Sequence, residues 1–443
     1  MQIRVDKLRK TMALLQPVVP KNPTLKILTN ILFKDGNVRA TDLETEVSVG
    51  IPEMNGEAFL LPFKQALEVL KYVPGDLLLT IESKGKSVRL SWDGGSASYM
   101  VVDYTDYPDT ALRAPASEAF LNGEVLIGAM AGALPYCATE TTRPVLSGVS
   151  VNLDTAIQVF GADGFRVSFE ALKLSFPVKQ TIVVPPNTVK VLETLWHKEP
   201  GKPNIGNSLV EQLTAARPLN LGLWEGFMSV KFANITLVGK LIAGTPPDIL
   251  ALLNNFKEPV KVKVFAPDLF NAVRRLAGVA KEGSNIVMLQ WTDRKMTISA
   301  CNGEIGEITT EIPIQEGSNP GRIALNLSYL LDYLTGKEGL VTLGGETDKS
   351  PAVFHYGNRP IVAIMPMAAK WGDEPREDPK LEEDKTESVG GEANDTEEET
   401  EQIQDETQSV EEETPEIEPE KEPVSVSPEP KKKGGRRKKE KTK

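Results

Sequence analysis

One sequence pattern occurs three times in this chain, and it limits what the chain can fold into. Each copy alternates apolar and polar residues, turns, alternates again and then contains a corner of small residues. The copies span residues 32–51, 151–171 and 288–312, and their corners are Ala40-Thr41-Asp42, Gly161-Ala162-Asp163 and Ala300-Cys301-Asn302. Alternation with a period of two predicts strands with one buried face. The corners are 121 and 139 residues apart, a domain-sized spacing that predicts a tripled domain.

Each copy lies between two segments with helical periodicity. The first helices are expected at residues 5–18, 122–134 and 267–280, and the second helices at 62–72, 185–196 and 326–334. Strand-like alternation returns after each second helix, so the order helix, strands, helix, strands occurs three times. This order predicts an α+β fold in which helices cover one face of antiparallel sheets. The expected domains are residues 1–115, 116–258 and 259–370, followed by a tail at 371–443.

Charge is distributed unevenly between the predicted domains and the predicted tail. The net charge is −12; residues 373–443 carry 25 acidic and 13 basic residues, and the rest carries 37 of each. Residues 373–443 have no aromatic residue, and such a composition predicts disorder because it cannot bury enough apolar surface. The tail ends in a basic cluster at residues 431–439. The cluster is either simply solvated, or it contacts nucleic acid or folds back on the acidic part.

Several functional classes are disfavoured by residues that the chain lacks. Cys137 and Cys301 form no disulfide framework or zinc spacing, which indicates a reducing compartment. No signal peptide or membrane-length apolar run occurs, so we expect no membrane partner and a cytoplasmic location. His197 is expected in a loop and His355 in a strand, neither in a triad or metal site. The sequence therefore predicts no cofactor and no catalysis, although catalytic groups that meet only in space stay open.

Two short segments are candidates for a contact surface. Residues 361–367, IVAIMPM, place Pro366 between two methionines, and residues 162–167, ADGFRV, form a corner with an aromatic residue and an arginine. Taken alone, an edge strand and a turn with a half-exposed Phe explain both segments.

Several motifs together resemble one protein family. They are TLKILTNILF at 24–33, RATDLE at 39–44, TRPVLSGV at 142–149, ADGFRV at 162–167, KLIAGTPPD at 240–248 and IMPM at 364–367. In this order they resemble the bacterial replicative sliding clamp, the beta subunit of DNA polymerase III. The resemblance covers about residues 1–368 and agrees with the tripled domain.

The resemblance implies three DNA-clamp domains per chain and a head-to-tail homodimeric ring. Helices would line the inside of the ring and sheets the outside. The expected DNA contacts are Lys7, Arg9, Lys10, Lys21, Arg143, Lys190, Arg274 and Arg275. Asn22 departs from the family, which often has an arginine there. Tyr99 and Val279 are the expected dimer contacts.

The resemblance also implies a pocket for short peptides between the second and third domains. One side would comprise Leu146, Ala162, Gly164, Phe165, Arg166 and Val167; the other would comprise Pro247, Leu252, Ile364, Met365, Pro366 and Met367. Met side chains repack at low cost, so such a pocket accepts varied Leu and Phe anchors. Phe165 replaces a common histidine and Ala251 stands where a basic residue is frequent, so partner specificity is expected to differ.

The function that the resemblance implies is that of a processivity factor. The ring would encircle double-stranded DNA without sequence preference. It would bind the polymerase III catalytic subunit and the clamp loader through short peptide motifs. The alternative is a repeat-built adaptor that binds peptides of replication or repair proteins but never encircles DNA.

Overall fold

The computed structural model describes residues 1–108, 114–140, 142–199, 217–292, 294–317, 319–357 and 359–371. All of them belong to one compact unit that spans Met1–Glu374. The predicted tail lies outside the described residues except for its first residue, Trp371.

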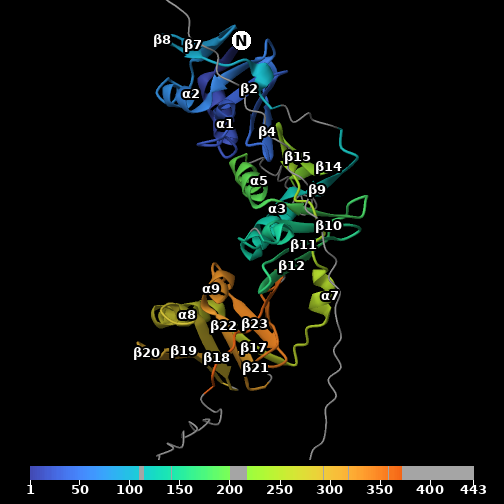
Figure 1. The fold of residues 1–443 in the computed structure, drawn as a ribbon, viewed down its shortest axis with the longest axis vertical. Helices are drawn as coiled ribbons and strands as arrows, with labels where there is room; N and C mark the ends of the chain where they lie inside the picture. The colour runs from blue at the N-terminus through green and yellow to red at the C-terminus, as the bar shows by residue number, and fades with distance from the viewer. Residues whose placement is uncertain are drawn as a thin grey trace, which may run out of the picture. The chain divides into compact units, whose positions relative to one another are not determined.

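One order of elements, a strand, a helix, four strands, a helix and three strands, occurs three times in the described residues (Figure 1). The first repeat comprises β1 (Gln2–Arg4), α1 (Val5–Leu15), β2 (Asn30–Lys34), β3 (Asn37–Thr41), β4 (Thr45–Gly50), β5 (Phe59–Pro62), α2 (Phe63–Leu70), β6 (Leu78–Lys84), β7 (Ser87–Trp92) and β8 (Gly95–Met100). The second comprises β9 (Ser117–Asn122), α3 (Gly123–Ala133), β10 (Val149–Leu153), β11 (Ile157–Ala162), β12 (Arg166–Leu172), β13 (Gln180–Val184), α5 (Pro186–Lys198), β14 (Pro218–Trp224), β15 (Phe227–Phe232) and β16 (Ile235–Lys240). The third comprises β17 (Val260–Phe265), α8 (Ala266–Lys281), β18 (Ile286–Trp291), β19 (Lys295–Asn302), β20 (Gly306–Pro313), β22 (Gly321–Asn326), α9 (Leu327–Leu334), β23 (Leu340–Gly345), β24 (Ala352–His355) and β25 (Ile361–Ile364). Short additions are α4 (Pro144–Ser147), α7 (Ile249–Asn254) and β21 (Glu316–Gly317).

The three small-residue corners have the same local structure. A side-chain oxygen of Asp42, Asp163 or Asn302 accepts hydrogen bonds from the backbone N–H groups two and three residues later, at 2.7–3.3 Å. This short-range bond turns the chain tightly at the end of a strand. Each corner therefore joins the second and third strands of its repeat's middle four, and the sequence pattern marks equivalent positions.

The predicted helices all form, with shifted ends. Asn122 caps α3 as expected, because its side chain accepts from the Val125 N–H at 3.3 Å. Pro267 and Asp268 lie in the first turn of α8. Two expectations were wrong. A strand precedes each first helix, and His197 lies in the last turn of α5 rather than in a loop.

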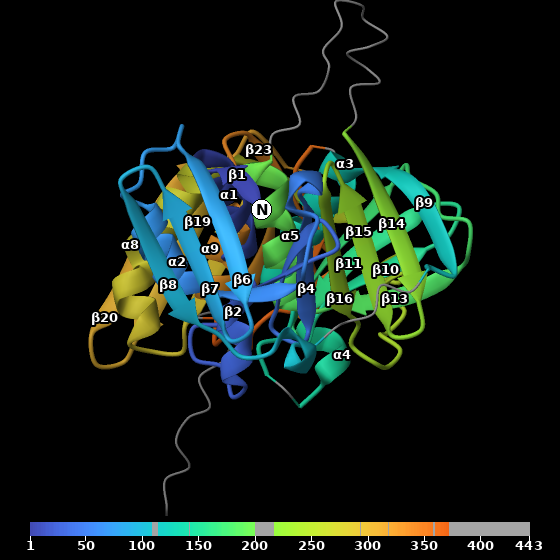
Figure 2. The ribbon, with the colours of Figure 1, turned by 90° about the horizontal axis from the view of Figure 1, so that it is seen from above.

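Strand pairing joins the repeats into continuous sheets. The described strands form an eight-stranded sheet, β5-β2-β3-β4-β16-β15-β14-β9, and a nine-stranded sheet, β13-β10-β11-β12-β25-β24-β23-β17-β21. Four-stranded sheets, β1-β6-β7-β8 and β20-β19-β18-β22, complete the first and third repeats. We call the antiparallel pairing of β4 with β16 joint 1 and that of β12 with β25 joint 2. Figure 2 shows β4 beside β16.

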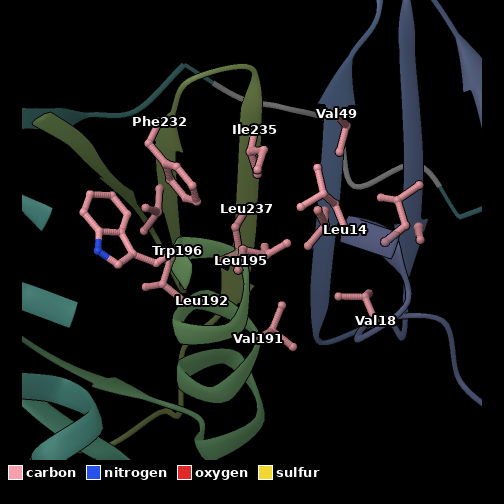
Figure 3. Packing of buried hydrophobic residues seen from close by; sticks show 14 of the residues in the cluster. Leu14, Val18, Val49, Val191, Leu192, Leu195, Trp196, Phe232, Ile235 and Leu237 are labelled. Carbon is pink, nitrogen blue, oxygen red and sulfur yellow. The ribbon is translucent and has the colours of Figure 1, made fainter. Parts of the chain in front are cut away.

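Joint 1 lies inside one core that the first and second repeats share. Val47 and Val49 of β4 pair with Leu237 and Ile235 of β16, and all four are buried. Helices α1 and α5 cover this face, with Leu14, Val18, Val191 and Leu195 in the same cluster (Figure 3). The third repeat has a separate core around α8 and α9. The hydrophobic effect therefore holds the first two repeats together more continuously than the last two.

Candidate functional site

A buried apolar cluster lies at joint 2, on the sheet face opposite the helices. Because strand residues alternate between faces, Val167 and Phe169 of β12 and Ala363 of β25 point away from α3. They cluster with Ile249 of α7, and Leu146, Leu253, Phe256 and Ile361 pack at the margin. Figure 1 shows α7 on the opposite side of the sheets from α3 and α9. We call this set, together with the cavity that adjoins it and is described below, the joint-2 groove.

The corner before β12 forms one wall of the groove. Gly164 has φ of +93°, a conformation that costs least for glycine, and it turns Phe165 outward. Phe165 is 59% exposed, and its carbonyl accepts a 2.7 Å hydrogen bond from the Met365 N–H. Met365 is itself 44% exposed. An aromatic side chain and a methionine from distant segments thus lie together at the surface.

A cavity of about 510 Å³ adjoins this corner. It is lined by Leu146, Gly164, Phe165 and Arg166 of the predicted pocket, together with Arg143, Tyr329 and the segment from Cys137 to Glu140. Among the predicted pocket residues, Ala162, Val167 and Ile364 are buried. The concavity has the size and mixed lining of a site for a small ligand or peptide side chains.

Arg166 points to the helix side of joint 2 and ties the second repeat to the third. Its guanidinium donates to Asp163, to Asp332 of α9 and to the Pro135 carbonyl, each at 2.8 Å. It also lies over the rings of Tyr136 and Tyr329. Only 10% of this side chain is exposed. Arg166 thus supports the wall of the cavity, and each of its three nitrogens donates a hydrogen bond within the chain.

The other predicted pocket residues lie on segments beside the groove. Pro247 is exposed in the segment before α7, and Leu252 is 46% exposed on α7. Asp248 caps α7 by accepting from the Ala251 N–H at 3.0 Å. Pro366 and Met367 are partly buried, and the Met367 N–H donates to the Ala324 carbonyl of β22.

Sequence reasoning missed the buried floor of the groove and a nearby ionic contact. Ile249, Phe160 and Phe169 look like ordinary core residues in sequence, because alternation alone does not show what covers a strand face. His355 Nε2 lies 2.9 Å from a carboxylate oxygen of Glu258, and Lys261 lies 3.2 Å from the same carboxylate. These residues attach the segment after α7 to the third repeat.

No catalytic arrangement emerges among the described residues. Burial, with the Asp163 charge, raises the pKa of the Cys137 thiol to about 12, so it is not a thiolate nucleophile at neutral pH. Within the described ranges, no cluster of His, Cys, Asp and Glu could hold a metal ion. No described helix is long and apolar enough to span a membrane.

The predicted DNA contacts lie on helices and loops at the surface. Lys10, Lys21, Arg143 and Lys190 are exposed. The others make contacts within the chain: Lys7 Nζ lies 2.6 Å from Glu53, Arg9 donates to the Lys71 carbonyl at 3.5 Å, Arg274 lies over Phe270, and Arg275 donates to Thr310 at 3.1 Å. An exposed, flexible cation suits a phosphate contact.

The predicted dimer contacts lie near two sheet edges. Tyr99 is in β8, the last strand of the β1-β6-β7-β8 sheet, and Val279 is in α8, which packs on β20 at the end of another sheet. The Tyr99 hydroxyl donates to the Gln65 carbonyl at 3.4 Å, and burial raises its pKa. Val279 is buried.

The tripled helix–strand order and its joined sheets define an α+β clamp fold. Residues 255–339 match the family model of the DNA polymerase III beta subunit, C-terminal domain. The chain is 24% identical over 348 residues to the beta sliding clamp of Caulobacter vibrioides, covering 75% of this chain and 89% of that protein. It is 22% identical over 380 residues to that of Pseudomonas aeruginosa, covering 82% and 98%. The family model and the relatives thus identify this chain as similar to beta sliding clamps over most of its length.

Solved structures agree in fold. The DNA polymerase III subunit beta from Pseudomonas aeruginosa matches with a TM-score of 0.74 at 20% identity, covering 83% of this chain and 100% of that one. The sliding clamp from Bacillus subtilis matches with a TM-score of 0.72 at 18% identity, covering 83% and 99%. The predicted fold class is therefore confirmed. The family comprises non-catalytic processivity factors of DNA replication, which confirms the expectation that the chain is not an enzyme.

Proposed function

We propose that two copies of this chain form a ring that encircles duplex DNA and tethers the replicative polymerase for processive synthesis. The strand pairing at the two joints carries this proposal. In each joint, the third of one repeat's middle four strands (β4 or β12) pairs with the last strand of the next repeat (β16 or β25). Among the described strands, the equivalent edges β20 and β8 have no partner on one side. A second copy would supply both partners, and two such contacts close a ring.

The three repeats would be clamp domains with boundaries near residues 115, 258 and 370. Their helices would face DNA and their sheets would form the outer wall. Exposed cations such as Lys10, Lys190 and Arg274 would attract phosphates without reading sequence. Enclosure would hold the ring on DNA, so weak contacts suffice and sliding stays fast. The ring would act on DNA in the cytoplasm.

The joint-2 groove would bind short peptides from the polymerase III catalytic subunit and the clamp loader. Its exposed Phe165, Leu252 and Met365 offer apolar contact area, and a few such anchors carry most of the energy in peptide complexes. Tethering raises the effective concentration of the polymerase at the primer end. The alternative, a peptide-binding adaptor that does not encircle DNA, shares this groove but lacks the ring.

Retention on DNA separates the ring from the adaptor. After loading onto nicked circular DNA, a ring stays bound through high-salt gel filtration and is released when the circle is linearised. Equal behaviour on circular and linear DNA would favour the adaptor.

Measuring the size of the chain in solution, with and without residues 373–443, should give a dimer in both cases. A monomer at micromolar concentration would contradict ring closure.

A charge at the proposed interface should weaken the dimer selectively. Met100 is 79% exposed in β8, and Phe120 is 77% exposed in β9, an edge that the ring does not use. We expect Met100→Lys to raise the dimer dissociation constant, because a charge on an edge strand opposes pairing. Phe120→Lys should leave it unchanged. Equal effects of the two variants would argue against the β8 edge.

Peptide binding can be tested at the groove itself. Phe165→Ala should weaken binding of a synthetic peptide with Leu and Phe anchors by about tenfold, because one exposed aromatic contact is lost. Phe120→Ala, which removes an exposed Phe elsewhere, is the matched control. Fluorescence anisotropy of a labelled peptide measures both affinities, and an unchanged value for Phe165→Ala would place the peptide elsewhere.

A further inference from the structure

A second cavity, of about 490 Å³, lies at joint 2 on the helix-bearing face. Its wall includes Glu124 and Gly128 of α3, Glu170 of β12, Tyr333 of α9 and Val362 of β25. Val362 belongs to the core beneath α8 and α9, and Glu170 alternates with Phe169 of the groove. This helix-side cavity is therefore on the opposite face of the sheet from the joint-2 groove.

Two cations that the sequence analysis did not single out line this cavity. Lys337 follows α9, and Arg359 precedes β25. The Lys337 amine donates to the Tyr333 carbonyl and lies 4.1 Å from the centre of the Tyr333 ring and 5.7 Å from that of Tyr356. Neither cation forms an ion pair among the described residues. Both keep donors available for an anion.

The surroundings of Lys337 are short of negative charge. Burial and the Arg359 charge lower the pKa of Lys337 to about 8. Glu124 is engaged by the Trp196 indole N–H at 2.8 Å. Burial raises the pKa of Glu170, against an opposing effect of Arg359, so its carboxylate is an imperfect counter-ion. An incoming anion would relieve the repulsion between the two cations.

The donors of the cavity wall match an oxygen-rich anion. The Lys337 amine and the Arg359 guanidinium both donate hydrogen bonds and both carry positive charge. Tyr333 also lines the cavity, but its hydroxyl, which has no hydrogen-bond partner among the described residues, is almost completely buried. The two cations are therefore the groups that an anion can reach.

The helices beside the cavity lack positive charge. Neither α3, GEVLIGAMAGA, nor α9, LSYLLDYL, contains a Lys or Arg. In contrast, α1, α5 and α8 carry Lys10, Lys190 and Arg274. Without cations from neighbouring loops, the helices at joint 2 would therefore present no positive side chain to DNA.

We propose that Lys337 and Arg359 bind a backbone phosphate of DNA at the helix-side cavity. The proposal rests on the proposed ring around DNA and identifies where that ring contacts the backbone at joint 2. A phosphodiester oxygen has the charge and the acceptor geometry that the two cations require.

Salt dependence of duplex binding tests the contact. The slope of log affinity against log salt counts neutralised phosphates. The double variant Lys337→Gln/Arg359→Gln should lower its magnitude by about 1, because one phosphate contact is lost, and each single variant should lower it by no more than that. Lys337→Arg should restore the parental slope. Lys231→Gln is the control, because Lys231 is exposed on β15 and points away from the helix side. Binding is measured with a short labelled DNA duplex and the full-length protein.

Two further measurements distinguish the explanations. The parent and the double variant are both tested for retention on nicked circular DNA. A retained parent with unchanged slopes in the double variant would overturn the phosphate site and leave the ring intact. If the parent is not retained on circular DNA, the ring is wrong. Reduced salt slopes in the variants would in that case still support the phosphate site. If inorganic pyrophosphate binds with Lys337 dependence while duplex slopes stay unchanged, the cavity takes a small phosphate ligand and the DNA contact is wrong.

Discussion

Joints 1 and 2 have the same strand pairing but opposite chemistry on the helix side. Aligning the corners equates Thr45, Val47 and Val49 of β4 with Arg166, Ser168 and Glu170 of β12. At joint 1 these positions are buried and largely apolar, and the Thr45 and Thr188 hydroxyls bond each other at 2.9 Å. At joint 2 the equivalent face holds the Arg166 ion pairs.

The sheet faces that point away from the helices differ in the opposite sense. At joint 1 this face holds the polar residues Glu46 and Ser48, both buried, whereas at joint 2 it holds the apolar residues Val167 and Phe169. Apolar surface on the helix side is covered by the chain's own helices, as at joint 1. Val167 and Phe169 on the outer side pack against Ile249 of α7 in the joint-2 groove. Joint 2 differs from joint 1 in the exposed apolar side chains beside this cluster, Phe165, Leu252 and Met365, which leave surface for a partner.

The largest expected loss of stability comes from placing the glutamate of joint 2, Glu170, at the equivalent buried position of joint 1, Val49. Val49 is 1% exposed between Ile235 and α1, so Val49→Glu would bury a carboxylate without a partner. We expect a loss of at least about 4 kcal/mol, seen as a lowered thermal unfolding midpoint. The reciprocal Glu170→Val should be tolerated. Equal midpoints for Val49→Glu and the parent would contradict the comparison.

Removing the arginine of joint 2 should have the next largest effect. Arg166→Met leaves Asp163 and Asp332 without their shared cation, and we expect the joint to weaken by about 2 kcal/mol. Hydrogen exchange of the β12 and β25 amides reports the opening free energy. Arg89→Met, at an exposed position of β7, is the control. Unchanged protection at β25 would show that Arg166 does not hold the joint.

The neutral hydroxyl pair of joint 1 should contribute less. Thr45→Val leaves the fully buried Thr188 hydroxyl without a partner, and we expect a loss of about 1 kcal/mol. Replacing both residues by Val removes the unsatisfied group, so the double variant should lie within about 0.5 kcal/mol of the parent. Hydrogen exchange of the β4 and β16 amides measures the stability loss of the single and the double variant. If the losses from the two substitutions added up in the double variant, the unsatisfied hydroxyl would not be the cause.

The smallest effect is a pH dependence at Glu170. Burial raises the pKa of this carboxyl above its ordinary value, so the folded state binds its proton more readily than the unfolded state. Stability from this group is therefore present at low pH and is lost as pH rises through the folded pKa. Glu170→Gln should be slightly stabilising at pH 7, with the gain vanishing at acid pH. A gain that grows on acidification would reverse the sign.

The sequence alone predicted much of the fold because the relevant signals are local. The corner carboxamides and carboxylates bond N–H groups two or three residues away, and helix stripes repeat within one segment. Lys337 and Arg359 could not be predicted, since nothing in their neighbourhoods marks them. Their cavity exists only because α3 of one repeat lies near the end of α9 of another.

The sequence by itself determined the threefold order, the α+β class and which residues of each strand share a face. Only the tertiary structure decided what covers each face. β4 meets β16 and β12 meets β25 across about 190 residues of chain in each case, and no local pattern encodes such a pairing. The physical reason is that alternation specifies a buried side, whereas the partner that buries it is selected by packing of the whole chain.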